Sequence, residues 1–88
     1  MKVRFKASFA GDLRDLKDRS LLDRIKALIA QVEAAPGLTE LSNLKKLRGG
    51  GAYYRVRVGD YRVGIALEQD EVVFVRVLHR REVYRYFP

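Results

Sequence analysis

Residues 53–67, YYRVRVGDYRVGIAL, decide the fold of this chain. Apolar and charged side chains alternate on both sides of Gly59-Asp60, which is the pattern of two half-buried β-strands joined by a tight turn. Glycine in the first position of a two-residue loop suits a type II′ turn. The stretch therefore predicts a β-hairpin with strands Tyr53–Val58 and Tyr61–Leu67.

A two-residue turn also fixes which residues of the hairpin face each other. Arg57 then lies directly opposite Arg62, and Arg55 lies opposite Gly64. Like charges in opposed positions destabilise a sheet, so stability gives no reason for this arginine pair. Because Gly64 and Ala66 are small, we predict a shallow concave anion site on this face. The alternative is a solvated sheet face that happens to be basic.

Hydrophobic spacing before the hairpin predicts one strand and two helices. Residues 2–6 alternate charged and apolar side chains, as a short strand does. Apolar residues at helical spacing predict helices over residues 8–18 and 20–35. Ser8 and Ser20 are the expected N-terminal caps, and a Pro-Gly pair ends the second helix. The two amphipathic helices should lie together on the apolar face of the hairpin.

After the hairpin, residues 72–78 predict the third strand of a meander. An even-length turn before this strand would align Arg76 with the core, where an unpaired charge is costly. We therefore predict an odd turn or a bulge. Val73, Val75 and Val77 would then point inward, and Arg76 would stay on the basic face.

Together these elements predict a single α+β domain over residues 1–88. The N-terminal strand and the helical hairpin should pack on one face of a small, mainly antiparallel β-sheet. Residues 38–48 are either a helical turn or an extended strip that covers the core. Gly49–Gly51 predicts a flexible loop, because the Gly-Lys-Ser/Thr of a phosphate-binding loop does not follow it.

The chain carries a formal charge of +7, and the excess is concentrated in its second half. Residues 45–88 hold ten basic and five acidic side chains, and every basic residue after Lys46 is arginine. Arginine presents a planar fork that binds phosphate through two hydrogen bonds. This half of the chain therefore favours a polyanionic partner, nucleic acid first, and a merely solubilising charge is the alternative.

The composition excludes several classes of protein. With 48% hydrophobic and 33% charged residues, the chain should be globular rather than disordered. It has no cysteine and one histidine, which excludes disulfides, thiol catalysis and Cys-based zinc sites. Neither a transmembrane run nor a secretory signal is present, so we expect a cytoplasmic protein without a membrane partner. The carboxylates lie in turns or on helices away from the basic face, so no metal site is expected there.

Residues 79–87, HRREVYRYF, bring a different chemistry to the end of the basic sheet. His79 and Tyr84 can transfer protons, and the arginines can stabilise phosphate charge. Aromatic rings in this segment can also stack on unpaired RNA bases. A purely structural histidine is the alternative for His79, and Val83 and Phe87 are the expected core anchors.

Three segments resemble the RelE toxins of the RelE/ParE superfamily in order and spacing. They are Leu44–Gly49, Tyr54–Val63 and Val77–Tyr84. The resemblance implies the toxin of a type II toxin–antitoxin system, which enters the ribosomal A site and cuts mRNA there. The RNA 2′-OH would be the nucleophile, with neither metal nor cofactor. The implied partners are a RelB-like antitoxin of acidic or amphipathic character, the ribosome and mRNA, with operator DNA bound only by the toxin–antitoxin complex.

The resemblance also implies roles for individual residues. Arg57, Arg62 and Arg80 correspond to positions that hold the scissile phosphate. His79 corresponds to a general acid, and Tyr84 to a C-terminal tyrosine that orients or deprotonates the 2′-OH. The remaining basic residues expected to contact RNA are Lys45, Lys46, Arg48, Arg55, Arg76 and Arg81.

The chain departs from its well-known relatives on the first hairpin strand. Arg55 and Arg57 stand where those relatives commonly carry lysine. Arginine stays protonated and is a poor general base. Either Tyr84 or His79 would then take the proton of the 2′-OH, or charge stabilisation alone would activate it.

Two other functions remain open at this point. One is a ParE-like protein that inhibits DNA gyrase by binding to it, and a shared fold cannot decide between the two. The other is a degenerate member that binds only its antitoxin and DNA. The converging arginines and His79 favour the nuclease.

Overall fold

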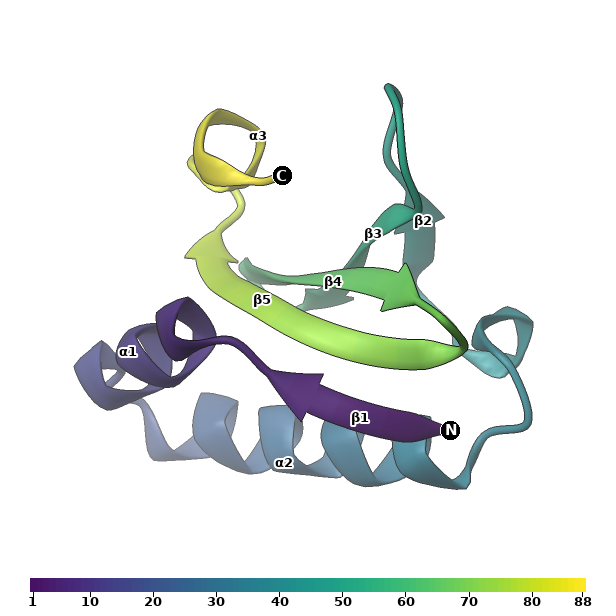
Figure 1. Ribbon diagram of the computed structural model, residues 1–88. Helices are drawn as coiled ribbons and strands as arrows, with labels where there is room; N and C mark the ends of the chain where they lie inside the picture. The colour runs from purple at the N-terminus through teal and green to yellow at the C-terminus, as the bar shows by residue number, and fades with distance from the viewer.

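The computed structural model describes residues 1–88 as a five-stranded sheet with helices on both sides (Figure 1). The strands follow the order β1-β5-β4-β3-β2, with β1 parallel to β5 and all other neighbours antiparallel. Their bounds are Lys2–Phe5 for β1, Leu44–Lys46 for β2, Tyr53–Val58 for β3, Tyr61–Glu68 for β4 and Glu71–His79 for β5. The predicted α+β fold is confirmed.

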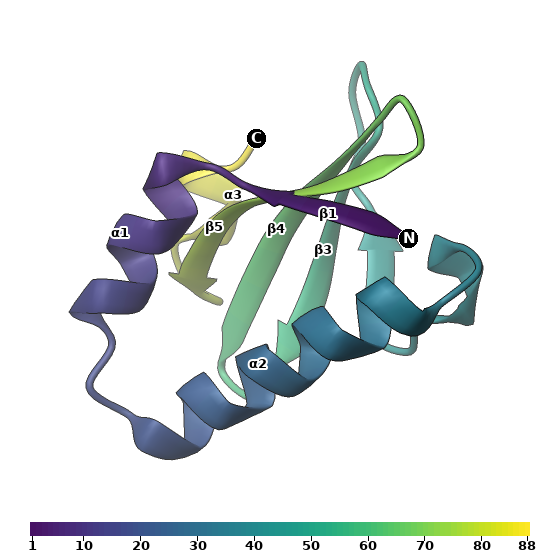
Figure 2. The ribbon, with the colours of Figure 1, turned by 60° about the horizontal axis from the view of Figure 1, so that its bottom comes forward.

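Two helices cover one face of the sheet, as predicted (Figures 1 and 2). α1 (Ala7–Asp15) buries Phe9, and α2 (Arg19–Ala34) buries Ile25 and Val32 against the apolar side chains of β3, β4 and β5. Burying such side chains contributes roughly 1.5–3 kcal/mol each, so this interface holds the helices on the sheet. No helix of the chain is both long and apolar enough to cross a membrane.

The predicted helix caps are wrong, because each helix begins one residue before its serine. Asp18 lies in extended backbone before α2, and its carboxylate accepts a hydrogen bond from the Leu21 N–H at 3.1 Å. Asp18 is therefore the cap, and Ser20 lies within the first turn. Ser8 lies inside α1, where its hydroxyl donates to the Val75 carbonyl at 2.6 Å and ties the helix to β5.

β3 and β4 pair in the register that the two-residue turn predicts. Val58 faces Tyr61 and Arg57 faces Arg62. Gly59, the first turn residue, has a φ of 60°, which suits glycine at that position of a type II′ turn. The register places the arginines on the sheet face that α1 and α2 do not cover.

The start of β5 differs from the prediction because its turn is short. Gln69 and Asp70 both have positive φ and form a two-residue turn, so the pairing begins at Glu68 opposite Glu71. This register aligns Val72 and Phe74 with the core under the helices. Val73 is therefore buried on the opposite face, not in the predicted core position.

The predicted bulge is present, but it lies inside the strand. Phe74 pairs with Ile65 and Arg76 with Gly64, which leaves Val75 as an extra residue on β5. The extra residue returns Val77 to the helix-covered core and takes Arg76 out of it, as predicted. Val75 itself does not join that core, contrary to the prediction, and packs against the cluster on the other face.

Asp12 of α1 accepts hydrogen bonds from the two residues that follow the bulge, Arg76 and Val77. Its Oδ2 accepts hydrogen bonds from the Val77 N–H and from Arg76 Nε, both at 2.8 Å, and its Oδ1 accepts from Arg76 Nη2 at 3.2 Å. The hydrogen bonds to Asp12 raise the pKa of the Arg76 guanidinium against the opposing effect of burial. This contact joins α1 to the centre of β5.

We expect Asp12→Ala to destabilise the fold by about 2 kcal/mol, because it leaves a part-buried N–H and a part-buried guanidinium without partners. Asp15→Ala on the same helix is the matched control, because Asp15 is exposed and makes no ion pair. Urea unfolding followed by circular dichroism measures both free energies of unfolding. Equal losses in the two variants would contradict this role of Asp12.

A second, smaller apolar cluster lies on the other face of the sheet. It contains Leu47, Leu78, Val83 and Phe87, and it carries the short helix α3 (Val83–Tyr86). The predicted anchoring by Val83 and Phe87 is confirmed, since both side chains are buried. α3 lies above β5 and β4, away from α1 and α2 (Figure 1).

Residues 38–48 contain both of the predicted alternatives. Leu38–Glu40 form a 3₁₀ turn, and Leu44–Lys46 form β2, which pairs with β3 at the edge of the sheet. The triple-glycine segment after β2 forms the loop of the long β2–β3 hairpin that projects from the sheet (Figure 1). This hairpin and α3 flank the uncovered face of the sheet.

Candidate functional site

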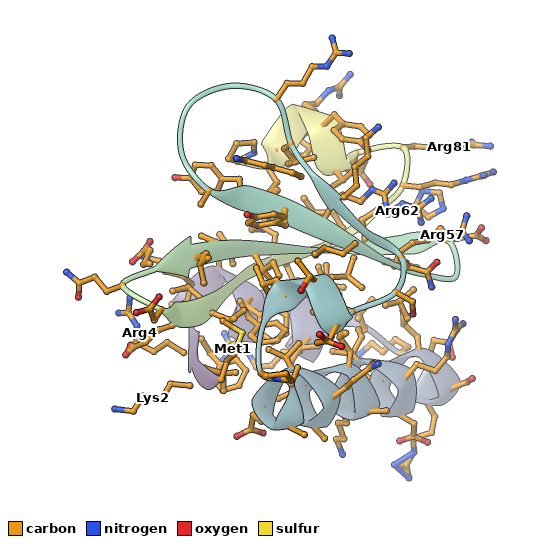
Figure 3. All side chains as sticks on the ribbon, turned by 90° about the vertical axis from the view of Figure 1, so that its right-hand side faces the viewer. Met1, Lys2, Arg4, Arg57, Arg62 and Arg81 are labelled. Atoms are coloured by element: carbon orange, nitrogen blue, oxygen red, sulfur yellow. The ribbon has the colours of Figure 1, made fainter.

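Three arginines gather on the sheet face opposite α1 and α2. Arg57 and Arg62 are directly paired across β3 and β4, and Arg55 lies two residues earlier on the same face of β3. Figure 3 shows Arg57, Arg62 and Arg81 on one side of the molecule, far from Arg4 on β1. We call Arg55, Arg57 and Arg62 the arginine cluster.

The charges of the arginine cluster act on one another. Burial, followed by the positive charges of Arg55 and Arg57, lowers the pKa of the Arg62 guanidinium below its ordinary value. Arg80 acts in the same direction, and the Tyr84 phenol acts in the opposite one. Arg55, Arg57 and Arg62 also lie on neighbouring positions of β3 and β4, so a bound anion would relieve the repulsion between these cations.

Backbone carbonyls hold two members of the cluster without neutralising them. Arg62 Nη1 donates to the carbonyls of Gly59 at 3.0 Å and Tyr61 at 2.9 Å, which fixes the guanidinium against the hairpin turn. Arg55 Nη1 donates to the Asn43 carbonyl at 3.0 Å, and its buried Nε has no partner. No carboxylate forms an ion pair with the cluster. Its positive charge is therefore available to a ligand.

The predicted space over Gly64 is filled by the protein itself. A Cβ atom at this position would lie 2.8 Å from three ring atoms of Phe87. The absence of a side chain at Gly64 thus makes room for the Phe87 ring and not for an anion. This part of the prediction is wrong. The sequence of the hairpin gives no information about the distant residue Phe87, whose ring occupies the space over Gly64.

Of the three arginines expected at the end of β5, the structure brings two toward the site. Arg80 and Arg81 are exposed after the strand, and Arg80 Nε lies 4.0 Å from Asp60 Oδ1. The Arg80 N–H donates to the Asp60 carbonyl at 2.8 Å, which holds this segment against the hairpin turn. Arg76 is bound by Asp12 and does not join the cluster.

His79 is turned away from the arginine cluster. It pairs with Tyr61, and the two rings meet edge to face with centroids 5.4 Å apart. Since Tyr61 and Arg62 are consecutive on β4, their side chains point to opposite faces of the sheet. His79 Nδ1 also accepts the Arg81 N–H at 3.2 Å. This geometry does not favour the general-acid role expected for His79.

Tyr84 is an exposed residue of α3 that lines a basic groove. Its side chain is 62% exposed, and it lines a groove of about 320 Å³ between α3 and the β2–β3 hairpin. The other residues that line this groove are Lys45, Lys46, Leu47, Arg48, Phe87 and Pro88. The three basic residues that the sequence expects to contact RNA between residues 45 and 48 are therefore brought together with Tyr84, while Leu47 and Phe87 are almost fully buried at the base of the groove.

The part of the site that sequence reasoning missed is the base of this groove. The sequence predicts Phe87 as a core anchor and places Leu47 in a strip that covers the core, and nothing in their spacing indicates that they lie beside Tyr84. The chain contains no group of three or more His, Cys, Asp or Glu side chains that could hold a metal ion. The assembled groups are the arginine cluster, the Tyr84 phenol and the basic groove that Tyr84 lines.

Comparison with known proteins finds relatives that are all toxins. The family model of the ParE toxin of type II toxin–antitoxin systems matches residues 3–84. Toxin RelE3 of Methanocaldococcus jannaschii is 42% identical over 100% of both chains. Putative toxin RelE1 of the same organism is 38% identical over 80% of this chain and 81% of its own.

Solved structures agree with these sequence relatives. The toxin in the RelB-RelE antitoxin–toxin complex from Methanococcus jannaschii superposes with a TM-score of 0.82 at 38% identity, covering 97% of this chain and 99% of that one. In the archaeal RelE-RelB complex from Pyrococcus horikoshii the TM-score is 0.73 at 24% identity, with 90% and 93% covered. The second similarity is evidence for the fold alone.

Proposed function

Because the chain belongs to the ParE toxin family of type II toxin–antitoxin systems, we propose that it is a RelE-like endoribonuclease that cuts mRNA on the ribosome. The family model carries the ParE name, whereas both sequence relatives carry the RelE name. The observation that favours a nuclease is the arginine cluster. Three guanidiniums without a carboxylate partner are costly for a fold, and they suit the charge that develops on a phosphate during cleavage.

In the proposed reaction, the 2′-oxygen attacks the adjacent phosphorus. The new bond forms from the 2′-oxygen, the bond to the 5′-oxygen breaks, and the product is a 2′,3′-cyclic phosphate with a free 5′-hydroxyl. Arg57, Arg62 and Arg80 would contact the non-bridging oxygens. The 2′-OH proton has to leave and the 5′-oxygen has to gain one, so the reaction needs proton transfer but no redox partner.

Tyr84 is the side chain best placed to handle the 2′-OH. It is exposed, it lines the basic groove, and it is one of the charged groups that act on the pKa of the Arg62 guanidinium. Arginine does not accept a proton at neutral pH, so Arg55 and Arg57 are assigned to phosphate contacts alone. Lys45, Lys46 and Arg48 would bind the RNA backbone along the groove without reading its sequence.

We expect His79→Ala to lower the cleavage rate less than about tenfold, which is below the hundredfold or more typical of a lost general acid. The reason is that the His79 ring packs on Tyr61 and turns from the arginine cluster. Single-turnover cleavage on programmed ribosomes measures the rate. A loss above a hundredfold in a folded variant would mean that the ring leaves Tyr61 when RNA binds and acts as the acid after all.

We also propose that a RelB-like antitoxin is the protein partner. Two similar structures were solved as complexes of RelE with RelB. A chain with a charge of +7 and an unneutralised arginine cluster would bind RNA indiscriminately when free. An acidic or amphipathic antitoxin that covers the cluster would prevent this binding.

The deciding experiment maps the ends of a translated message. The chain is added to a cell-free translation system, and primer extension locates new 5′ ends within codons. Cuts that require the ribosome support the proposal. Intact messages together with inhibited DNA gyrase would support the ParE-like alternative, and the absence of both effects would support a member without catalysis.

A further inference from the structure

The ring of Phe87 is seated directly on the backbone of Gly64. Phe87 is 2% exposed, and a Cβ atom at Gly64 would lie 2.8 Å from three atoms of the ring. Real Cβ atoms do not approach other carbon atoms so closely, so only glycine allows the ring to rest there. Tyr53 meets the same ring edge to face, with centroids 5.7 Å apart and an interplanar angle of 88°. The ring is thus held from two sides.

This seat fixes a helix that is too short to be stable by itself. α3 has four residues, and one helical turn costs more to nucleate than its hydrogen bonds return. Its ends are held by Val83, which is fully buried, and by Phe87, whose N–H donates to the Val83 carbonyl at 2.8 Å. Tyr84 lies between these two anchors. Its own hydroxyl makes no hydrogen bond to the protein.

The strand that carries the seat also carries the central arginine of the cluster. Gly64 and Arg62 lie on the same face of β4, two residues apart. The position of Tyr84 relative to Arg62 is therefore set through a chain of rigid contacts: strand β4, the Phe87 ring and one turn of α3.

We propose that Phe87, seated on Gly64, is a positioning residue that holds Tyr84 at the arginine cluster. The proposal rests on the function proposed above and adds a requirement to it. A displacement of about 1 Å between reacting groups can cost on the order of a hundredfold in rate, whereas binding of the RNA backbone tolerates it. Because the Phe87 side chain is itself only 2% exposed and offers almost no surface to RNA, its loss should affect the chemical step and leave substrate affinity unchanged.

The first test compares kcat and affinity in Phe87→Ala. Single-turnover cleavage of a programmed ribosome at saturating protein should slow at least tenfold, while the Kd for the programmed ribosome should change less than about twofold. Phe5→Ala is the control truncation, because Phe5 lies 52% exposed on β1 at the far edge of the sheet. An unchanged rate in folded Phe87→Ala would overturn the proposal.

A double-mutant cycle distinguishes positioning from a general loss of structure. If Phe87 acts through Tyr84, then Phe87→Ala should lower the rate no further in a Tyr84→Phe background. Multiplied losses in the double variant would overturn the proposal. Wild-type protein that fails to cut any message would instead overturn the proposed function, so the two failures are distinguishable.

A second cycle tests the seat itself and does not depend on Phe87→Ala alone. Gly64→Ala should slow cleavage in the wild type because its Cβ displaces the ring, and it should have no further effect once Phe87 is alanine. Phe87→Leu keeps an apolar anchor without a flat ring. Its cleavage rate replaces that of Phe87→Ala in the test if the alanine variant fails to fold. A rate equal to wild type in folded Gly64→Ala or Phe87→Leu would contradict the role of the seat.

Discussion

An Arg62→Ala variant is expected to fold normally and to cut translated mRNA at least a hundredfold more slowly than the wild type. Arg62 interacts electrostatically with both other arginines of the cluster, since burial and the charges of Arg55 and Arg57 lower its pKa. A guanidinium in this state donates strongly to a developing negative charge. Removing one such donor from a preorganised site typically costs about 3–4 kcal/mol of transition-state stabilisation.

The fold should tolerate the loss of Arg62. The substitution removes hydrogen bonds to the Gly59 and Tyr61 carbonyls at the surface, but it also relieves the repulsion from Arg57 directly opposite. Thermal unfolding should therefore shift little, and the cleavage rate measures the site alone. Arg14→Ala on exposed α1 removes the same charge from the other side of the sheet and should cut at the normal rate. Undiminished cleavage by folded Arg62→Ala would contradict the assignment of the site.

A message with a 2′-methoxy nucleotide at the cut position is expected to resist cleavage completely. The reason is that the site offers phosphate donors and a phenol, that the Asp60 carboxylate beside it is paired with Arg80, and that the chain has no cluster of carboxylates that could hold a metal ion. The nucleophile must then come from the RNA, and a 2′-methoxy group has no proton to lose. The unmodified message should yield a 2′,3′-cyclic phosphate at the new 3′ end.

The modified message is a better probe than removal of metal, because the ribosome itself requires Mg²⁺. The matched control carries the 2′-methoxy group two nucleotides away, where cutting should proceed at the normal rate. Mass spectrometry of the 3′ fragment identifies the cyclic phosphate. Efficient cutting at a 2′-methoxy position would contradict attack by the 2′-oxygen and would call for a hydrolytic mechanism.

The hairpin was predictable from the sequence because its turn allows one register only. Once Gly59-Asp60 is a two-residue turn, every pairing from Val58 to Tyr53 follows, including the Arg57–Arg62 contact. The helices were predictable for a similar reason, since their hydrophobic spacing extends over several turns. Their caps were not, because a cap depends on the backbone conformation of one residue.

Two other features that escaped prediction, the position of the bulge within β5 and the contact of Phe87 with Gly64, depend on contacts between distant parts of the chain. The bulge at Val75 is stabilised by Asp12, which lies more than sixty residues earlier, and a one-residue shift exchanges the two faces of a strand. That shift puts His79 beside Tyr61 and away from Arg62. The Phe87 ring over Gly64 is likewise a long-range fit, and hydrophobic patterning cannot distinguish it from ordinary burial.

Because Arg57 and Arg62 repel each other, the free energy of unfolding of this protein depends on whether an anion is bound at the arginine cluster. Any anion that binds the folded cluster and not the unfolded chain adds RT ln(1 + [L]/Kd) to the free energy of unfolding. The unoccupied protein would therefore be its least stable form, and it would gain stability both from an antitoxin that covers the arginines and from RNA bound at the site. A protein that passes from its antitoxin to RNA would be unoccupied in between, and in that interval it should open more often and be cleaved more readily by proteases.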